Sequence, residues 1–132
     1  MPADFELKPS TRTVYSRGWG ALTDTDLLDH LIRHAGRMRD GSITPEWAQI
    51  YDFTGVEHLR GVTSAGVRKL ADWNPWPAGC VRVAIVADDE QFGLVRMYQM
   101  IDPKADTLGI TRSAEEAEAW VARERARLSA DR

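Results

Sequence analysis

The chain has 132 residues, a formal net charge of −3 at pH 7 and 43% hydrophobic residues, which is the composition of one globular domain. A mildly acidic chain argues against general nucleic-acid binding, and no apolar run approaches the ~18 residues that an integral membrane helix needs. The acidic, polar start at residues 1–6 does not resemble a signal peptide, so we expect a cytoplasmic protein.

Strand and helix signals alternate along the first half of the chain. Residues 12–17 are rich in β-formers and predict a strand, which the glycines at 18–20 should end in a turn. Hydroxyls and acids followed by apolar residues at helical spacing predict a helix over 24–38. The segment 47–53 predicts a buried strand, and the glycine-containing segment 55–61 predicts a loop after it.

The middle of the chain carries a short helix and a central strand. Ser64 can cap a short helix, which the proline-rich turn at 74–79 ends. Residues 81–87 are apolar apart from Arg82, as in a strand covered on both faces. Cys80, the single cysteine, precedes this strand and is expected to be a small buried hydrophobe, since it can form no internal disulfide.

The last third completes an alternating pattern. Acids at 88–90 begin a helix that Asp102 and Pro103 end, residues 108–111 are a short strand candidate, and a capping box at 113–116 starts the final helix. A further strand near 5–8 is weakly signalled. Alternation of strands and helices predicts a single α/β domain, with helices packed on a sheet.

Four stretches carry a resemblance to a known family through their order and spacing, over residues 12–121. They are Gly18-Trp19-Gly20 leading into a helix, Ile50–Val56, the pair Val83–Asp88 and Phe92–Tyr98, and Ser113–Ala117 leading to Trp120-Val121. With these the chain resembles the SpoIIAA-like proteins, a bacterial family related in fold to the STAS domain. The resemblance implies a small mixed β-sheet flanked by about four helices, a fold also similar to the lipid-binding CRAL-TRIO domain. It brings no catalytic signature.

The resemblance singles out one serine. In anti-sigma-factor antagonists, a strand ending in Asp-hydrophobe-Ser/Thr precedes a helix start whose serine a partner kinase phosphorylates. Here 52–54 resembles that strand end and 63–67 resembles the helix start, so Ser64 falls at the phosphorylated position. Thr63 stands where the family has an acid, and the intervening loop is longer. The alternative is that Ser64 only caps the helix.

Asp26, His30 and His34 recur at every fourth residue and share one side of the predicted helix. Two histidines and a carboxylate are ligands suited to Zn²⁺. Arg33 and Arg37 stand beside the histidines and disfavour a cation. We therefore expect this side of the helix to be a polar, solvated face and predict no metal site.

Aromatic residues gather at turns and element ends. Trp19, Trp73 and Trp76, with Tyr98, are candidates for an apolar pocket or a dimer contact, because exposed aromatics are enriched in binding surfaces. The alternative is that Trp73 and Trp76 close one end of the core.

The sequence contains no nucleophile elbow, phosphate-binding glycine loop or HExxH motif, so we predict no catalytic residues and no cofactor. The favoured interpretation is a non-enzymatic regulatory or protein-interaction domain with an unknown protein partner, and a homodimer is plausible. The alternative is a carrier domain for a small apolar molecule or lipid. An enzyme is the third interpretation.

Overall fold

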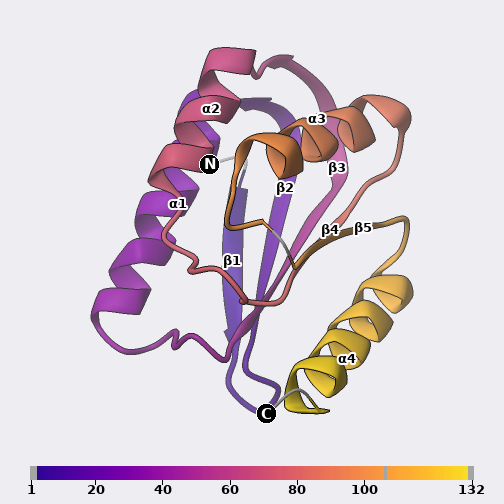
Figure 1. Cartoon of the computed structure of the whole chain (residues 1–132). Helices are drawn as coiled ribbons and strands as arrows, with labels where there is room; N and C mark the ends of the chain where they lie inside the picture. The colour runs from indigo at the N-terminus through magenta and orange to yellow at the C-terminus, as the bar shows by residue number, and fades with distance from the viewer. Residues whose placement is uncertain (1–2, 106, 131–132) are drawn as a thin grey trace.

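A computed structural model describes residues 3–105 and 107–130. Five strands and four helices follow one another along the chain (Figure 1). Their order is β1 (Ala3–Lys8), β2 (Thr13–Thr23), α1 (Asp24–Arg39), β3 (Ala48–Gly61), α2 (Ser64–Trp73), β4 (Arg82–Ile85), α3 (Asp89–Ile101), β5 (Leu108–Thr111) and α4 (Ala114–Ala130).

The strands form one mixed sheet in the order β1-β2-β3-β4-β5. The strand β1 is antiparallel to β2, and every later neighbour is parallel. Each parallel pair is joined through a helix, as parallel strands require. The predicted fold class, a small mixed sheet flanked by four helices, is confirmed, and the weakly signalled first strand is present.

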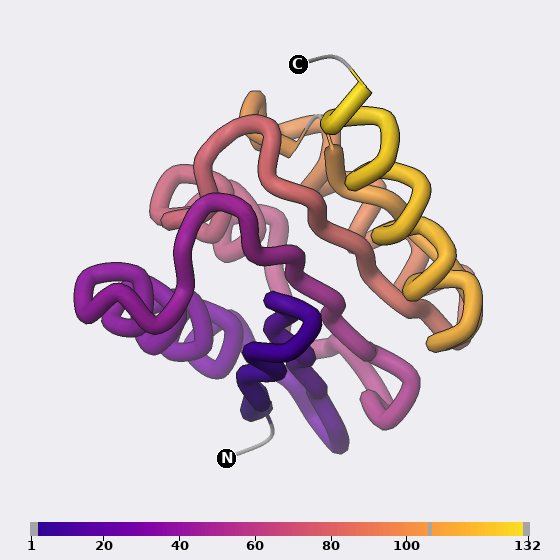
Figure 2. The backbone as a smooth tube through the Cα atoms, turned by 90° about the horizontal axis from the view of Figure 1, so that it is seen from below, coloured from indigo at the N-terminus to yellow at the C-terminus, as the bar shows by residue number. Residues whose placement is uncertain are grey.

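Helices cover the sheet on both faces. Phe53 and Ala84 share a core with residues of α1, α2 and α3, whereas Ile50, Val83 and Ile85 share a core with residues of α4. This division follows the alternation of side chains along β3 and β4. Figure 2 shows α1 and α4 on opposite sides of the strands. In the described part of the chain, no helix has both the length and the apolarity needed to cross a bilayer.

Two predicted breaks in the strands are wrong. Residues 18–20 are part of β2 rather than a turn, and residues 55–61 are part of β3 rather than a loop. The two strands stay paired as far as Thr23 and Gly61, with irregular register after Arg17 and after Gly20. Glycines that looked like breakers therefore serve a bulged strand pair, and Gly20 takes the left-handed φ of 63° that glycine tolerates.

The predicted solvated face of α1 is also wrong. His30 and His34 are 1% and 0% exposed and face the sheet, whereas Ile32, which the apolar pattern placed inside, is 51% exposed. The helix begins where predicted, because Thr23 and Asp26 form a reciprocal capping box. Cys80 is buried, as expected.

Candidate functional site

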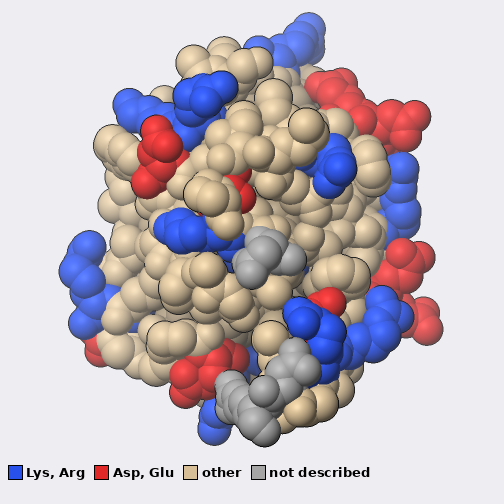
Figure 3. All heavy atoms as spheres, in the orientation of Figure 1, with Lys and Arg blue, Asp and Glu red and all other residues tan. Residues whose placement is uncertain are grey.

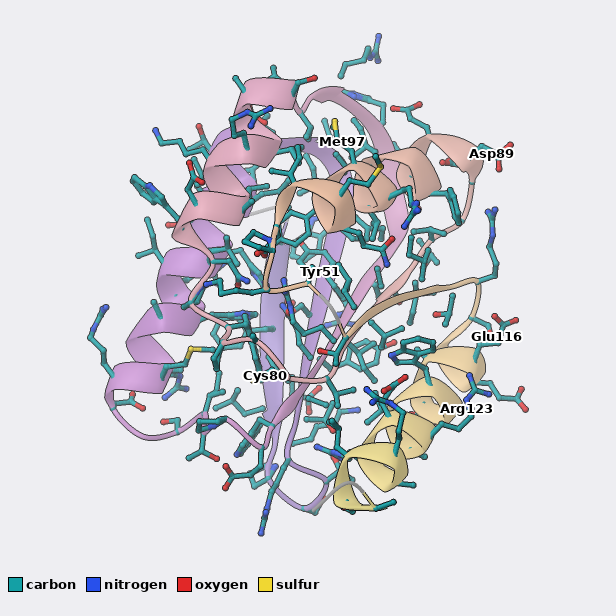
Figure 4. The ribbon with its side chains drawn as sticks, viewed as in Figure 1. Tyr51, Cys80, Asp89, Met97, Glu116 and Arg123 are labelled. Carbon is teal, nitrogen blue, oxygen red and sulfur yellow. The ribbon has the colours of Figure 1, made fainter. Side chains whose placement is uncertain are left out.

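A pocket of about 100 Å³ lies between the sheet and helices α1, α2 and α3. A water molecule needs only ~10–15 Å³ of such space, so the pocket has room for a group larger than one water molecule. Its surface is mainly apolar and it is partly open to solvent. Figure 4 places Tyr51 over the middle of the sheet, within the space that these helices surround. The apolar wall includes Leu27, Phe53, Val67, Leu70, Leu94 and Val95.

The pocket has a polar end and an apolar end. Gln49 and Arg82 are register partners where β3 and β4 enter the sheet, and both line the pocket. Phe53 lies four residues further along β3 and belongs to the apolar core. The same polarity holds on the helix side, because Tyr98 of α3 contacts Arg82 while Leu94 lies one turn earlier.

A buried hydrogen-bonded chain stands at the polar end. The Trp76 indole donates to His34 Nδ1 at 3.2 Å. Ser16 Oγ lies 3.4 Å from His34 Nε2 and 3.0 Å from His30 Nε2. All four side chains are at most 1% exposed.

The hydrogen bonds of this buried network decide where the proton of His34 sits. Burial lowers the pKa of His30 to about 3 and that of His34 to about 2, so both rings are neutral at pH 7. An indole N–H can only donate, so His34 Nδ1 accepts and His34 Nε2 carries the proton. That proton goes to Ser16. The Ser16 hydroxyl can donate to His30 Nε2 or accept from it, so both neutral forms of the His30 ring satisfy this contact.

Arg82 is held by a second buried network. Its Nη2 donates to the Tyr98 hydroxyl at 3.1 Å, and that hydroxyl donates to Asp102 Oδ2 at 2.6 Å. Asp102 also accepts from Asn74 Nδ2 at 2.9 Å. Burial raises the pKa of Tyr98 to about 12, so the phenol stays protonated and can bridge the two charges. Arg82 and Asp102 are 6% and 3% exposed.

Three buried polar atoms of pocket-lining residues have no hydrogen-bond partner among the described residues. They are His30 Nδ1, the Tyr51 hydroxyl and Arg82 Nη1. The nearest charge to Nη1 is Asp102 Oδ2 at 3.8 Å, which is too long for a hydrogen bond. Burial raises the pKa of Tyr51 and keeps its phenol protonated. Within the described ranges no cluster of three or more His, Cys, Asp or Glu side chains could hold a metal ion.

This arrangement of sheet and helices has a counterpart among solved structures. The structure of the anti-sigma factor antagonist SpoIIAA in its unphosphorylated form matches with a TM-score of 0.55, over 91% of this chain and 97% of that chain. The fold is that of SpoIIAA. The SpoIIAA-like architecture predicted from the sequence is thereby confirmed. The two sequences are 15% identical, so the likeness is one of fold. Neither a protein-family model nor a curated protein matches the sequence.

In this SpoIIAA-like fold, Ser64 is the first residue of α2 and is exposed. The helix is capped by Thr63, whose hydroxyl accepts from the Gly66 amide at 3.0 Å. Asp24 lies against this helix start and accepts from the Thr63 amide at 2.9 Å and from the Thr63 hydroxyl at 2.6 Å. The prediction that Ser64 caps this helix is therefore wrong, because Thr63 is the capping residue, and an acid from α1 binds Thr63.

The four aromatic candidates lie in separate places. Tyr98 lines the pocket, and Trp76 is fully buried against His34. Trp19 lines a second hollow on the sheet, beside the Asp4–Arg17 ion pair. Trp73 is 54% exposed near the end of α2. Figure 3 shows Lys, Arg, Asp and Glu dispersed over the face of the molecule in view, with uncharged surface between them.

Sequence reasoning missed the polar end of the pocket. Arg82 was visible as the one charge in an apolar strand, and strand alternation places it on the same face as Ala84. His30 and His34 sit at the helical spacing that also relates Leu27 to Leu31. Nothing local in the sequence indicates that Ser16 and Trp76 supply the hydrogen bonds that make burial of the two rings tolerable.

Proposed function

We propose that the protein is a non-catalytic regulatory domain that acts by binding a protein partner. The observation that carries the proposal is the fold shared with an anti-sigma factor antagonist along nearly the whole of both chains. With helices on both faces of the sheet, the contact surface consists of the outer faces of the helices, their ends and the loops. Ser64, which the family resemblance singles out, lies on this surface in the exposed first turn of α2.

We place the control point of this regulation at Ser64. A phosphate added there would introduce negative charge beside the Asp24 carboxylate, which already occupies the helix start. The two negative groups would repel each other next to Thr63, whose amide and hydroxyl Asp24 binds. Arg60 and Arg68 are exposed residues near Ser64 in the sequence. Phosphorylation is thus expected to displace Asp24 and to reshape the corner between α1 and α2.

The proposal is tested by capture of partners from the source cell with the wild-type protein, Ser64→Glu and Ser129→Glu. Ser129 is an exposed serine in α4, far along the chain from the corner, so it controls for added charge alone. We expect a protein that the wild type and Ser129→Glu retain and that Ser64→Glu loses. The same set of proteins on all three baits would overturn the role of Ser64, and no specific protein on any bait would overturn the proposed function.

A second candidate function is that of a carrier for a small molecule. The specific observation in its favour is the partly open, mainly apolar pocket beneath α1, α2 and α3.

A further inference from the structure

We propose that the pocket beneath α1, α2 and α3 binds a small amphipathic carboxylate, with its head at Arg82 and its apolar body against Phe53 and Leu94. This site is independent of the protein-binding role proposed above, because its residues lie beneath the helices rather than at the exposed corner.

The unpartnered atom at the polar end is a donor. Arg82 Nη1 carries hydrogens only, and it is buried without a hydrogen-bond partner among the described residues. A buried donor without an acceptor is costly, so a ligand that supplies acceptors is favoured here. A carboxylate offers two oxygens and about four acceptor sites, and it pairs well with a guanidinium.

Charge selects an anion over a neutral acceptor. Among the described residues that line the pocket, Arg82 is the one with a formal charge. Asp102 offsets part of the Arg82 charge. However, Asp102 Oδ2 already accepts from Tyr98 and Asn74, and Asp102 Oδ1 accepts from the Lys104 amide at 2.9 Å. The guanidinium donates from Nε to Gln49 Oε1 and from Nη2 to the Tyr98 hydroxyl, and Nη1 remains for a ligand.

The apolar end of the pocket determines the chemistry of the rest of the ligand. Phe53, Leu70 and Val95 belong to one hydrophobic core and also line the pocket. Apolar surface of this kind binds a hydrocarbon chain or ring by removing it from water. One polar end and one apolar end therefore predict a ligand with a single acidic head.

The first experiment compares three probes with the same eight-carbon chain: octanoate, octanol and octylamine. Binding is followed by amide chemical shifts in two-dimensional NMR of the full chain. We expect saturable shifts with octanoate in β3, β4, α1 and α3, and at least ~10-fold weaker binding of octanol, because one hydrogen bond to a charged group is worth roughly that factor. Octylamine should not saturate. Equal binding of octanoate and octylamine, or octanoate shifts confined to other elements, would overturn the proposal.

The three probes test the head of the ligand, and a variant tests its body. Leu94→Trp fills the apolar end from a half-buried helix position and should abolish octanoate binding while the spectrum stays folded. Unchanged affinity for octanoate in Leu94→Trp would contradict the assigned site.

Discussion

Tyr51 and Tyr98 line the same pocket with opposite hydrogen-bond status. The Tyr51 hydroxyl is buried without a partner among the described residues, whereas the Tyr98 hydroxyl accepts from Arg82 and donates to Asp102. A buried hydroxyl without a partner destabilises the folded state, whereas a hydroxyl that joins two charged groups stabilises it. Two identical chemical changes should therefore have effects of opposite sign.

We predict that Tyr51→Phe raises the free energy of unfolding by about 1 kcal/mol and that Tyr98→Phe lowers it by about 2 kcal/mol. Urea denaturation of the two variants and the wild type, without added ligand, measures both values. Each variant is the control for the other, since both remove one oxygen from the same residue type. A loss of stability in Tyr51→Phe would mean that its hydroxyl is hydrogen-bonded in solution.

At the scale of secondary-structure elements, α4 docks on β5 through a residue that must have no side chain. A Cβ on Gly109 would overlap the Trp120 ring. Trp120 packs against the same core as Val121 and Ile85, so the indole is not free to swing away. The helix and the strand thus approach each other at a distance that only glycine permits.

Gly109→Ala should therefore lower the free energy of unfolding by about 2 kcal/mol through overpacking. Gly93→Ala is the matched control, because Gly93 is an exposed residue of α3 whose added Cβ would meet no atom within 4 Å. There alanine should raise stability by about 1 kcal/mol through its better helix propensity. Thermal or urea unfolding of both variants checks the pair, and equal changes would show that Trp120 does not hold β5.

The elements also show where local sequence signals are sufficient. Helix starts were predictable because the cap is local: Thr23 with Asp26, and Asp88 with Gln91, lie three residues apart. The lengths of β2 and β3 were not, because each strand extends only through pairing with the other across about thirty intervening residues. Glycine within such a pair has the same sequence signature as glycine in a turn.

For the site, the sequence showed single residues but not their association. Arg82 and Tyr98 were noticeable for their type, yet the contact that joins them spans separate elements. The histidines of α1 looked solvated because polar side chains usually are. Only the fold brings Ser16 of β2 and Trp76 of the loop after α2 to the two histidines. These contacts make the histidines buried rather than solvated.

At the scale of the whole molecule, the two buried histidines make the stability of the domain depend on pH. Burial lowers the pKa of His30 to about 3 and that of His34 to about 2, with further lowering by Arg33. His30 and Arg82 lower the pKa of His34 as well, and the ordinary value is 6.5. Below pH 6.5 the unfolded chain therefore takes up two protons that the folded chain refuses. The stabilisation is complete above pH 6.5 and declines as the pH falls toward 3.

Between pH 6.5 and pH 5 we predict a loss of about 1.5 kcal/mol in the free energy of unfolding for each histidine. Urea denaturation at pH 5.0, 5.5, 6.0 and 6.5 measures the slope. His30→Gln removes one of the two titrating groups. The slope of the unfolding free energy against pH should then correspond to about one proton fewer, whatever the effect of the substitution on stability at pH 7. Ser16→Ala is the control, because it cuts the hydrogen-bonded chain between the rings but leaves both histidines buried, so it should lower stability and keep the wild-type slope. If His30→Gln kept that slope too, His30 would not be a neutral, buried group in the folded chain.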